Sequence, residues 1–334
     1  MEDIHKIKLL LTVPQDIVIL SHRNPDGDAV GSSFGLYHIL KKLNHKITVI
    51  FPSEFPTTFE YLSEINRSII YDLKPEESKN AIEKASVMFF LDFNAIDRID
   101  RMAEFVLQSN AKKILIDHHI DTEPIAQYYF SDTEASSTSE LVYKFINDLG
   151  FDNLIGLECG ECLFTGIITD TGSFKYGTRP YTYEVAAKLK MKGVDDYYLQ
   201  NAINNNLDEK HLRLLGHCLA NRMEVLPDYG VAIIWLTKDD YVQFSIQRGD
   251  TEGIVNYMLM MKSIKMAAFI TEQPSIVKLS LRSKDGLNVQ EIAANHFNGG
   301  GHKNASGGSA YAKLEDVINR LKKIIPNYIK QVNI

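Results

Sequence analysis

Residues 17–28 read Ile17-Val18-Ile19-Leu20-Ser21-His22-Arg23-Asn24-Pro25-Asp26-Gly27-Asp28, a short apolar run followed by a polar loop. Four consecutive apolar residues, three of them β-branched, predict a buried strand. The next segment, Val30 to Leu43, predicts a helix with one apolar face made by Leu36, Ile39, Leu40 and Leu43. A strand, a polar loop and a helix in this order predict the first unit of an α/β domain.

Three further apolar runs have the same character: Ile47 to Phe51, Val87 to Leu91 and Ile114 to Ile116. Continuous apolar strands that alternate with helices indicate a parallel sheet covered by helices on both faces. Ligands bind to such sheets beyond the carboxyl ends of the strands. The residues that directly follow each run are therefore the first candidates for a functional site.

Acidic and histidine side chains follow these elements. They are His22, Asp26 and Asp28 after the first strand, Asp92 after the run that ends at Leu91, Asp117, His118 and His119 after the run that ends at Ile116, and Asp170 at the end of a helix predicted from Leu154 to Thr169. If the fold gathers these carboxylates, each pair about 4 Å apart costs roughly 4 kcal/mol at an effective dielectric constant of about 20. Unless several carboxylates are protonated, bound cations must offset this repulsion. The sequence therefore predicts metal ions, and the histidines favour manganese over magnesium, which prefers oxygen ligands.

Each motif also has a structural interpretation. The segment from His22 to Asp28 could be a plain turn in which Gly27 permits a tight backbone path. Asp92, Asp117 and Asp170 could each cap a helix, and His118 with His119 could be a surface pair. Four motifs that all follow apolar elements favour metal ligands. Gly31-Ser32 is expected to open a helix whose N–H groups attract an anion.

The last third of the chain predicts a second set of elements. Strands are expected at Val231 to Leu236, Lys265 to Glu272 and Ser275 to Arg282, and helices at Val289 to Phe297 and Leu314 to Lys323. The glycine-rich segment Gly299 to Gly308 would be either a flexible loop or a phosphate cradle of backbone N–H groups ahead of the second helix. Arg282 would either clamp a phosphate or lie on a solvated basic face.

Length and composition limit the classes of function. A chain of 334 residues is long enough for two domains, and the expected division is 1–185, a helical linker at 186–228, and 229–334. A formal net charge of −7 disfavours binding to long duplex nucleic acid. No apolar run approaches about 18 residues, so no membrane span is expected. Three cysteines give no disulfide framework and favour the cytoplasm.

The motifs resemble those of the DHH phosphoesterases. The matching segments are His22 to Ser32, Asp92, Asp117-His118-His119 and Gly166 to Phe174, and Arg282-Ser283 with Gly299 to Gly307 resembles the DHH-associated C-terminal domain. The resemblance covers nearly the whole chain and is closest to the NrnA-like subgroup. It implies an α/β fold with a mainly parallel-sheet N-terminal domain, a smaller α/β C-terminal domain and an active-site cleft between them. The segments Ile120 to Pro124 and Asp97-Arg98 depart from the family pattern, which leaves the substrate preference open.

The resemblance also implies a role for each site residue. His22, Asp26 and Asp92 would hold one manganese ion, and Asp28, Asp92, His118 and Asp170 would hold a second, with Asp92 bridging the two. Asp117 would orient an imidazole, and His119 would reach the scissile phosphate. The substrate would be bound by Arg282, Ser283, Gly300, Gly301 and His302. The two ions would activate a shared water that attacks phosphorus.

The expected activity is manganese-dependent hydrolysis of short oligoribonucleotides such as pApA, and removal of the 3′-phosphate from 3′-phosphoadenosine 5′-phosphate. The leading alternative is a cyclic dinucleotide phosphodiesterase. A manganese pyrophosphatase, a single-strand DNA exonuclease of the RecJ kind and a non-catalytic nucleotide-binding module fit the sequence less well. The expected partners are short RNA or small nucleotides, and the oligomeric state stays open, a homodimer included.

Overall fold

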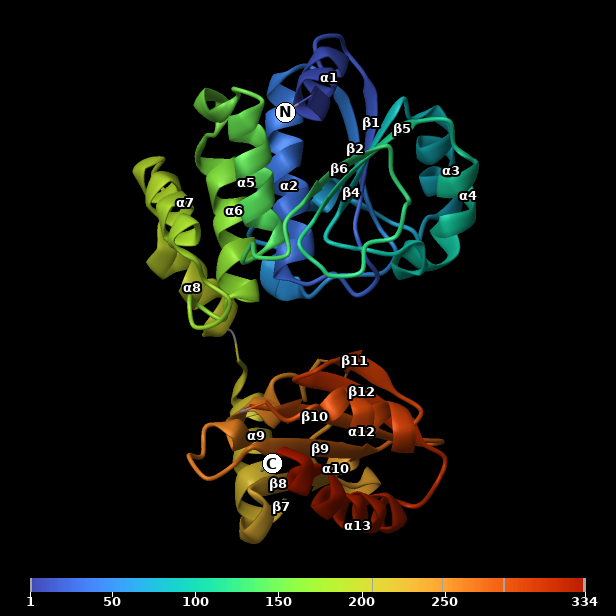
Figure 1. Cartoon of the computed structure of the whole chain (residues 1–334), viewed down its shortest axis with the longest axis vertical. Helices are drawn as coiled ribbons and strands as arrows, with labels where there is room; N and C mark the ends of the chain where they lie inside the picture. The colour runs from blue at the N-terminus through green and yellow to red at the C-terminus, as the bar shows by residue number, and fades with distance from the viewer. Residues whose placement is uncertain (1, 206, 248, 285, 333–334) are drawn as a thin grey trace. The chain divides into compact units, whose positions relative to one another are not determined.

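The computed structural model describes residues 2–205, 207–247, 249–284 and 286–332 of the chain, which forms two compact units, 1–206 and 207–334 (Figure 1). The division falls inside the segment 186–228, for which the sequence predicted a helical linker. Its two ends belong to different cores, because Leu199 is buried in the first unit whereas Leu214 is buried in the second. Within the described ranges, no helix combines the length and the apolar character needed to cross a membrane.

A six-stranded parallel sheet forms the centre of the first unit, in the order β3-β2-β1-β4-β5-β6. The strands are β1 (Asp16–Leu20), β2 (Lys46–Phe51), β3 (Ile69–Ile70), β4 (Val87–Leu91), β5 (Lys112–Asp117) and β6 (Tyr128–Ser131). The four predicted strands are confirmed. The sequence did not predict β3, which has only two residues, or β6, whose residues are half-buried or exposed. The strand order reverses between β1 and β4, which is the point where ligands bind to such sheets.

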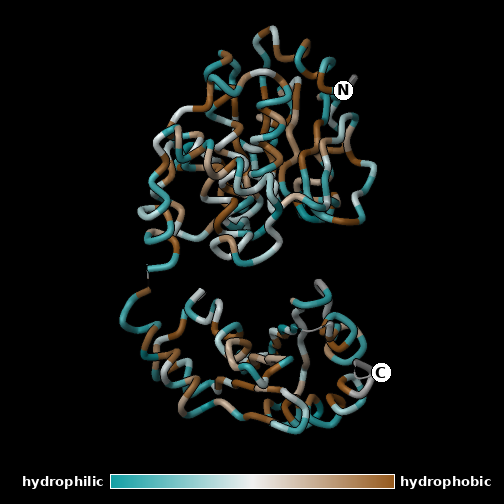
Figure 2. The backbone as a smooth tube through the Cα atoms, turned by 60° about the vertical axis from the view of Figure 1, so that its left-hand side comes forward, coloured by the Kyte–Doolittle hydropathy of each residue, from teal (hydrophilic) through white to brown (hydrophobic). Residues whose placement is uncertain are grey.

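Helices cover both faces of this sheet, with α2, α5 and α6 on one side and α3 and α4 on the other (Figure 1). The helices are α1 (Glu2–Leu10), α2 (Gly27–Lys42), α3 (Pro75–Lys84), α4 (Ala103–Gln108), α5 (Thr138–Asp148), α6 (Leu157–Asp170), α7 (Pro180–Met191) and α8 (Asp196–Asn204), with short 3₁₀ helices at Thr57–Phe59, Ile65–Arg67, Ile96–Met102 and Asp152–Leu154. Successive strand residues face opposite cores, so Ile19 packs with α2 while Leu20 packs with the α3 side. The central strands are accordingly hydrophobic along their length (Figure 2).

Glycines allow α2 and α6 to approach closely. Gly27, Gly31 and Gly35 are spaced four residues apart on α2, so they line one face of that helix. A Cβ atom at Gly31 would overlap the carbonyl oxygen of Cys162 and would lie 2.8 Å from the backbone nitrogen of Gly166. This close contact brings the start of α2 beside the C-terminal half of α6.

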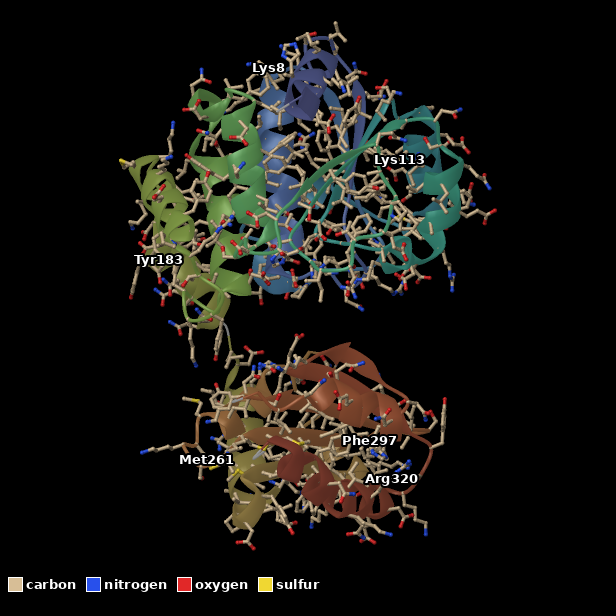
Figure 3. All side chains as sticks on the ribbon, viewed as in Figure 1. Lys8, Lys113, Tyr183, Met261, Phe297 and Arg320 are labelled. Carbon is tan, nitrogen blue, oxygen red and sulfur yellow. The ribbon has the colours of Figure 1, made fainter. Side chains whose placement is uncertain are left out.

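The second unit contains a mixed six-stranded sheet in the order β11-β12-β10-β9-β8-β7, antiparallel except between β8 and β9. Its elements are β7 (Met223–Leu226), β8 (Val231–Leu236), β9 (Met266–Glu272), β10 (Val277–Ser283), β11 (Gly300–His302), β12 (Ala305–Ala310), α9 (Glu209–Asn221), α10 (Lys238–Gln243), α11 (Ile254–Leu259), α12 (Val289–His296), α13 (Leu314–Val332) and a 3₁₀ turn at Pro227–Tyr229. The predicted strands and helices of this region are confirmed. Phe297 is fully buried in the core beneath α12 and α13, and the guanidinium of Arg320 lies 5.4 Å from its ring centre (Figure 3).

The glycine-rich segment is neither a flexible loop nor a turn directly ahead of a helix. Gly300–His302 pairs with Ala305–Ala310 as an antiparallel hairpin at the edge of the sheet. The absence of side chains is what lets the segment fit, because a Cβ atom at Gly299 would overlap the carbonyl oxygen of Gly307. The expectation of a loop was therefore wrong: glycine here serves close packing of backbones rather than mobility.

Candidate metal centre

The loop after β1 turns into α2 at Asp26, which is the N-cap residue of that helix. Asp26 Oδ1 accepts hydrogen bonds from the backbone N–H groups of Asp28, at 3.0 Å, and Ala29, at 3.1 Å. The helix therefore begins at Gly27, and the expectation that Gly31-Ser32 opens it was wrong, because Asp26 already occupies the first-turn donors. The sequence suggested that Gly27 permits a tight backbone path, but its φ is not positive. Its small size is needed instead, because a Cβ atom there would overlap the side chain of Thr169.

Asp28 lies in the first turn of α2 and is almost fully buried. Its carboxylate accepts two backbone hydrogen bonds from the start of α5, from Thr138 N to Oδ2 at 2.6 Å and from Ser139 N to Oδ1 at 2.9 Å. A Cβ atom at Gly166 of α6 would lie 2.6 Å from Asp28 Oδ1. Three helices thus converge on this carboxylate, and glycine on α6 makes room for it.

Asp92 directly follows β4 in a left-handed backbone conformation, with φ of 65°. Residues other than glycine adopt this conformation rarely, and it costs of the order of 1 kcal/mol or more, which concentrates such residues at functional sites. The carboxylate is buried, and its Oδ1 accepts a hydrogen bond of 2.9 Å from the hydroxyl of Thr138. The strained turn therefore places a second carboxylate beside the start of α5.

Two imidazoles point Nε2 towards these carboxylates. Nδ1 of His22 lies 3.0 Å from the carbonyl oxygen of Arg23, and Nδ1 of His118 lies 3.2 Å from that of Ala135. Because a carbonyl oxygen only accepts, Nδ1 carries the proton in each ring and Nε2 of the neutral ring holds a lone pair. Metal-binding histidines are fixed by outer hydrogen bonds of this kind.

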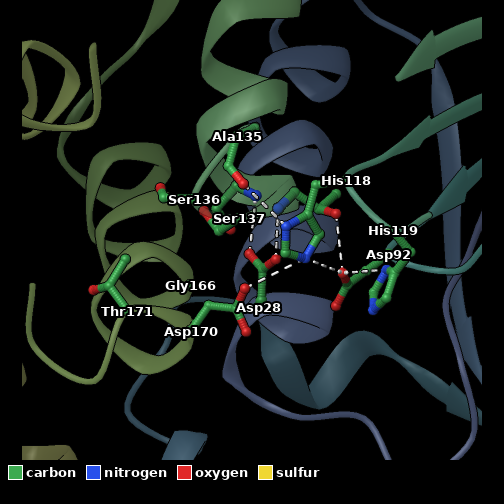
Figure 4. A network of polar contacts seen from close by, with 12 residues as sticks. Asp28, Asp92, His118, His119, Ala135, Ser136, Ser137, Gly166, Asp170 and Thr171 are labelled. Atoms are coloured by element: carbon green, nitrogen blue, oxygen red, sulfur yellow. Dashed lines mark hydrogen bonds and ion pairs between the residues drawn. The ribbon is translucent and has the colours of Figure 1, made fainter. Parts of the chain in front are cut away.

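The two imidazoles belong to compact groups of ligand atoms among the described residues. Nε2 of His22 lies 3.4 Å from Asp92 Oδ2. Nε2 of His118 lies 3.3 Å from Asp170 Oδ2 (Figure 4). Ligand atoms lie within 4.8 Å of one another in three groups: His22 with Asp26 and Asp92, Asp28 with His118 and Asp170, and Asp92 with His118 and His119. The structure thus brings together all six side chains that the resemblance implied as metal ligands. Asp92 belongs to two of the groups and connects them.

The carboxylates of the site have pKa values shifted in opposite directions. Burial acts to raise the pKa of Asp92, but the hydrogen bond and charge of His22 outweigh it and hold that pKa well below its usual range. Burial, and then the charge of Asp92, raise the pKa of Asp170 to about 7, and the same two causes raise the pKa of Asp28. Burial by itself lowers the pKa of His22, but the hydrogen bond and charge of Asp92 outweigh it and raise that pKa to about 9. The site therefore retains protons that a divalent cation could replace, which fits a metal centre.

Asp117 and His119 form a hydrogen-bonded pair, and His119 also belongs to one of the three groups. Asp117 is fully buried at the end of β5, and its Oδ1 lies 2.7 Å from Nδ1 of His119 while its Oδ2 accepts the His119 backbone N–H at 3.2 Å. Nδ1 of His119 also lies 3.9 Å from Asp92 Oδ1. Burial alone lowers the pKa of His119, but the hydrogen bond that its ring donates to Asp117 and the charge of the nearby Asp92 raise it. The resemblance implied that Asp117 orients an imidazole, and in the structure Asp117 contacts the imidazole of His119.

The sequence pattern did not point to the segment that supports these ligands, residues 132–139. It contributes the Ala135 carbonyl, the Thr138 hydroxyl and the two backbone donors to Asp28. The sequence did contain a signal for the helix that follows this segment. Ser137 caps α5, and the backbone N–H of Glu140 donates to the Ser137 hydroxyl at 3.0 Å. A serine followed three residues later by glutamate is a helix-start signature.

The predicted substrate-binding residues lie in the second unit. Arg282 is half-buried on β10, where it donates to the carbonyl of Leu281 at 3.0 Å, and burial lowers its pKa. The hydroxyl of the buried Ser283 donates to the carbonyl of Leu287 at 2.6 Å. Gly300 and Gly301 lie on β11, and the side chain of His302 lies outside the described residues.

Comparison with known proteins identifies both units. Residues 16–167 match the family described as DHH family, N-terminal domain, and residues 229–331 match the DHHA1 domain. The crystal structure of an exopolyphosphatase-related protein from Bacteroides fragilis is 37% identical, with a TM-score of 0.97 over 100% of this chain and 98% of that chain. The chain belongs to the DHH family. The expected class of hydrolase acting on phosphodiester and phosphate bonds is confirmed by this membership.

Among the relatives of this DHH chain are two enzymes whose names state their activity. The bifunctional oligoribonuclease and PAP phosphatase NrnA of Bacillus subtilis (strain 168) is 28% identical over 92% of this chain and 94% of its own length. The cyclic-di-AMP phosphodiesterase GdpP of the same organism is 25% identical over 98% of this chain and 50% of its own length. Both names describe hydrolysis of phosphate esters of adenine nucleotides or short RNA.

Proposed function

We propose that the protein is a manganese-dependent phosphohydrolase of short oligoribonucleotides that also removes the 3′-phosphate of 3′-phosphoadenosine 5′-phosphate. The observation that carries this proposal is the pair of ligand groups connected by Asp92 at the switch point of the sheet. The similarity to NrnA, which extends over 94% of that relative, supports the substrate class.

The donor set favours manganese. Aspartate oxygens come from Asp26, Asp28, Asp92 and Asp170, and imidazole nitrogens come from His22 and His118. Mixed oxygen and nitrogen donors suit manganese better than magnesium or calcium, which prefer oxygen alone. Two bound ions would lower the pKa of a coordinated water and offset negative charge on the phosphate oxygens.

The remaining side chains have complementary roles. Asp117 holds the ring of His119 through Nδ1, and this imidazole is proposed to reach the scissile phosphate. The backbone donors of Thr138 and Ser139 and the Thr138 hydroxyl hold Asp28 and Asp92 in orientation before any ligand binds. In the second unit, Arg282 and Ser283, with Gly300, Gly301 and His302, are proposed to bind the substrate. The guanidinium of Arg282 has no carboxylate partner among the described residues, which leaves it available to a phosphate.

A cyclic dinucleotide phosphodiesterase is the second candidate, because GdpP aligns with 98% of this chain. The alignment covers only half of GdpP, whereas NrnA is covered almost completely. We therefore expect linear substrates to be preferred.

A substrate panel tests the proposal. The full chain, first freed of metal with a chelator, would be assayed with pApA, 3′-phosphoadenosine 5′-phosphate and cyclic di-AMP, each with manganese, magnesium or no metal. We expect turnover of the first two with manganese and little turnover without metal. Hydrolysis of cyclic di-AMP at a higher kcat/KM than pApA would favour the second candidate, and metal-independent turnover would refute the metal assignment.

A further inference from the structure

One segment of the first unit contacts three of the proposed metal ligands. Residues 132–139 connect β6 to the first turn of α5. The Ala135 carbonyl accepts from His118 (Figure 4). The Thr138 hydroxyl donates to Asp92, and the backbone N–H groups of Thr138 and Ser139 donate to Asp28. The orientation of an imidazole and two carboxylates therefore depends on where this segment lies.

A buried carboxylate fixes the end of this segment. Glu140 is fully buried, and its Oε2 accepts from the hydroxyls of Ser136, at 2.7 Å, and Thr182, at 2.5 Å. Its Oε1 accepts from Arg179, at 2.7 Å from Nε and 2.6 Å from Nη2. A buried carboxylate needs several donors of this kind to offset its lost hydration.

Arg179 connects this carboxylate to the beginning of the segment. It is the N-cap residue of α7, and its Nη1 donates to Asp132 Oδ2 at 2.8 Å. One planar guanidinium thus binds both Asp132, which precedes Ala135 in the sequence, and Glu140, which follows Thr138. Arginine can bridge two carboxylates through its several donors, whereas the single ammonium of lysine is less suited to do so.

Stability alone does not account for this arrangement. Replacing a buried ion pair by apolar side chains is often neutral or stabilising, because the lost hydration of the charges offsets their attraction. The network is instead placed where it fixes the direction of hydrogen bonds to His118, Asp28 and Asp92. None of Arg179, Glu140 and Asp132 belongs to the ligand groups themselves.

We propose that Arg179, through Asp132 and Glu140, is a positioning residue that holds segment 132–139 in the geometry needed for metal binding. The inference rests on the proposed metal centre. Loss of the guanidinium would leave all six ligands in the chain. The side chains of His118, Asp28 and Asp92, which contact the segment, would no longer be held in the orientation that the metal needs. Outer contacts of metal ligands typically contribute a factor of 10 to 100 in affinity.

The test measures manganese binding directly, by calorimetric titration of the full metal-free chain at pH 7.5. We expect Arg179→Ala to weaken the Kd for manganese by roughly 10- to 100-fold, and Arg179→Lys to restore only part of it. The matched control is Lys144→Ala, which removes an ion pair with Asp148, 2.7 Å long, on the same helix α5 but away from the segment. This control should keep the wild-type Kd.

The outcomes separate the two proposals. A wild-type chain that binds no manganese would refute the metal centre and this inference with it. A wild-type chain that binds manganese while Arg179→Ala binds it equally well would overturn the positioning role alone, as would an equal loss in Lys144→Ala. If Arg179→Ala fails to fold, as judged by thermal unfolding in EDTA, Thr182→Val removes one donor to Glu140 and keeps the ion pair. A several-fold weaker Kd is then expected, and an unchanged Kd would refute the inference.

Discussion

Nε2 of His22 lies 3.4 Å from Oδ2 of Asp92, a contact that joins the loop after β1 to the strained turn after β4. The two strands are neighbours in the sheet, and the sheet order reverses between them. The pair shows how the topology creates the site: parallel strands deliver their next residues to one edge, and the reversal leaves that edge open to a ligand.

Asp92→Asn should abolish most of the activity with little change in fold. Asparagine tolerates the left-handed conformation of position 92 nearly as well as aspartate, whereas alanine would add backbone strain. Loss of one carboxylate shared by two ligand groups should reduce manganese-dependent kcat/KM by more than about 100-fold, beyond the usual cost of losing an outer contact. Kinetics with pApA and circular dichroism check both parts. Asp148→Asn, on the outer end of α5, is the control, and equal activities of the two variants would contradict the prediction.

Asp117→Asn should lower kcat while leaving manganese affinity nearly unchanged. The asparagine can still contact His119 but no longer provides the charge that holds the ring and raises its pKa. We expect a loss of roughly 10- to 100-fold in kcat, as for other groups that orient a reacting imidazole. Steady-state kinetics and calorimetric titration measure the two quantities separately. A variant that loses metal binding instead would place Asp117 in the metal centre.

Manganese affinity should fall as the pH drops below about 9, because His22, with a pKa of about 9 in the metal-free protein, must lose a proton to bind the metal. The fall should be steeper below about 7, where Asp170, with a pKa of about 7, also retains its proton. Each displaced proton contributes about tenfold in Kd per pH unit. The folded-state pKa of Asp170 is raised above the unfolded value of about 3.9, so the metal-free fold binds more protons and loses stability as pH rises between these values.

The increase in Tm on adding manganese should therefore be larger at pH 8 than at pH 5.5. Differential scanning calorimetry with manganese and with EDTA at both pH values measures it. An increase that does not depend on pH would show that no proton is displaced from the site.

Gly31→Ala should destabilise the first unit by about 1–3 kcal/mol, the usual cost of overpacking, because the added methyl group meets the backbone of α6. The matched control is Gly216→Ala, also within a helix, where nothing lies within 4 Å of the added atom. This change should stabilise the second unit by about 0.5–1 kcal/mol through helix propensity. Denaturant unfolding with probes in each unit distinguishes the two signs, and a neutral Gly31→Ala would contradict the close helix contact.

The sequence predicted the fold well where burial produces continuous apolar runs, as in Val87 to Leu91, which is fully buried between two helical layers. It did not predict β6, because an edge strand with one solvated side carries no such run. The six ligands were predictable because each follows an apolar element, and parallel pairing then brings their positions together. Arg179 was not, because its importance comes from a contact with Glu140, 39 residues earlier in the chain, which no local pattern encodes.

The glycines of α2 have no functional groups, so a search for reactive side chains passes over them. They nevertheless set the separation between the helix that carries Asp28 and the helix that ends at Asp170. Activity in homologous proteins therefore depends on residues that never touch a reactant. A homologue with a larger residue at the position of Gly31 could lose activity although it retains every aspartate and histidine of the site.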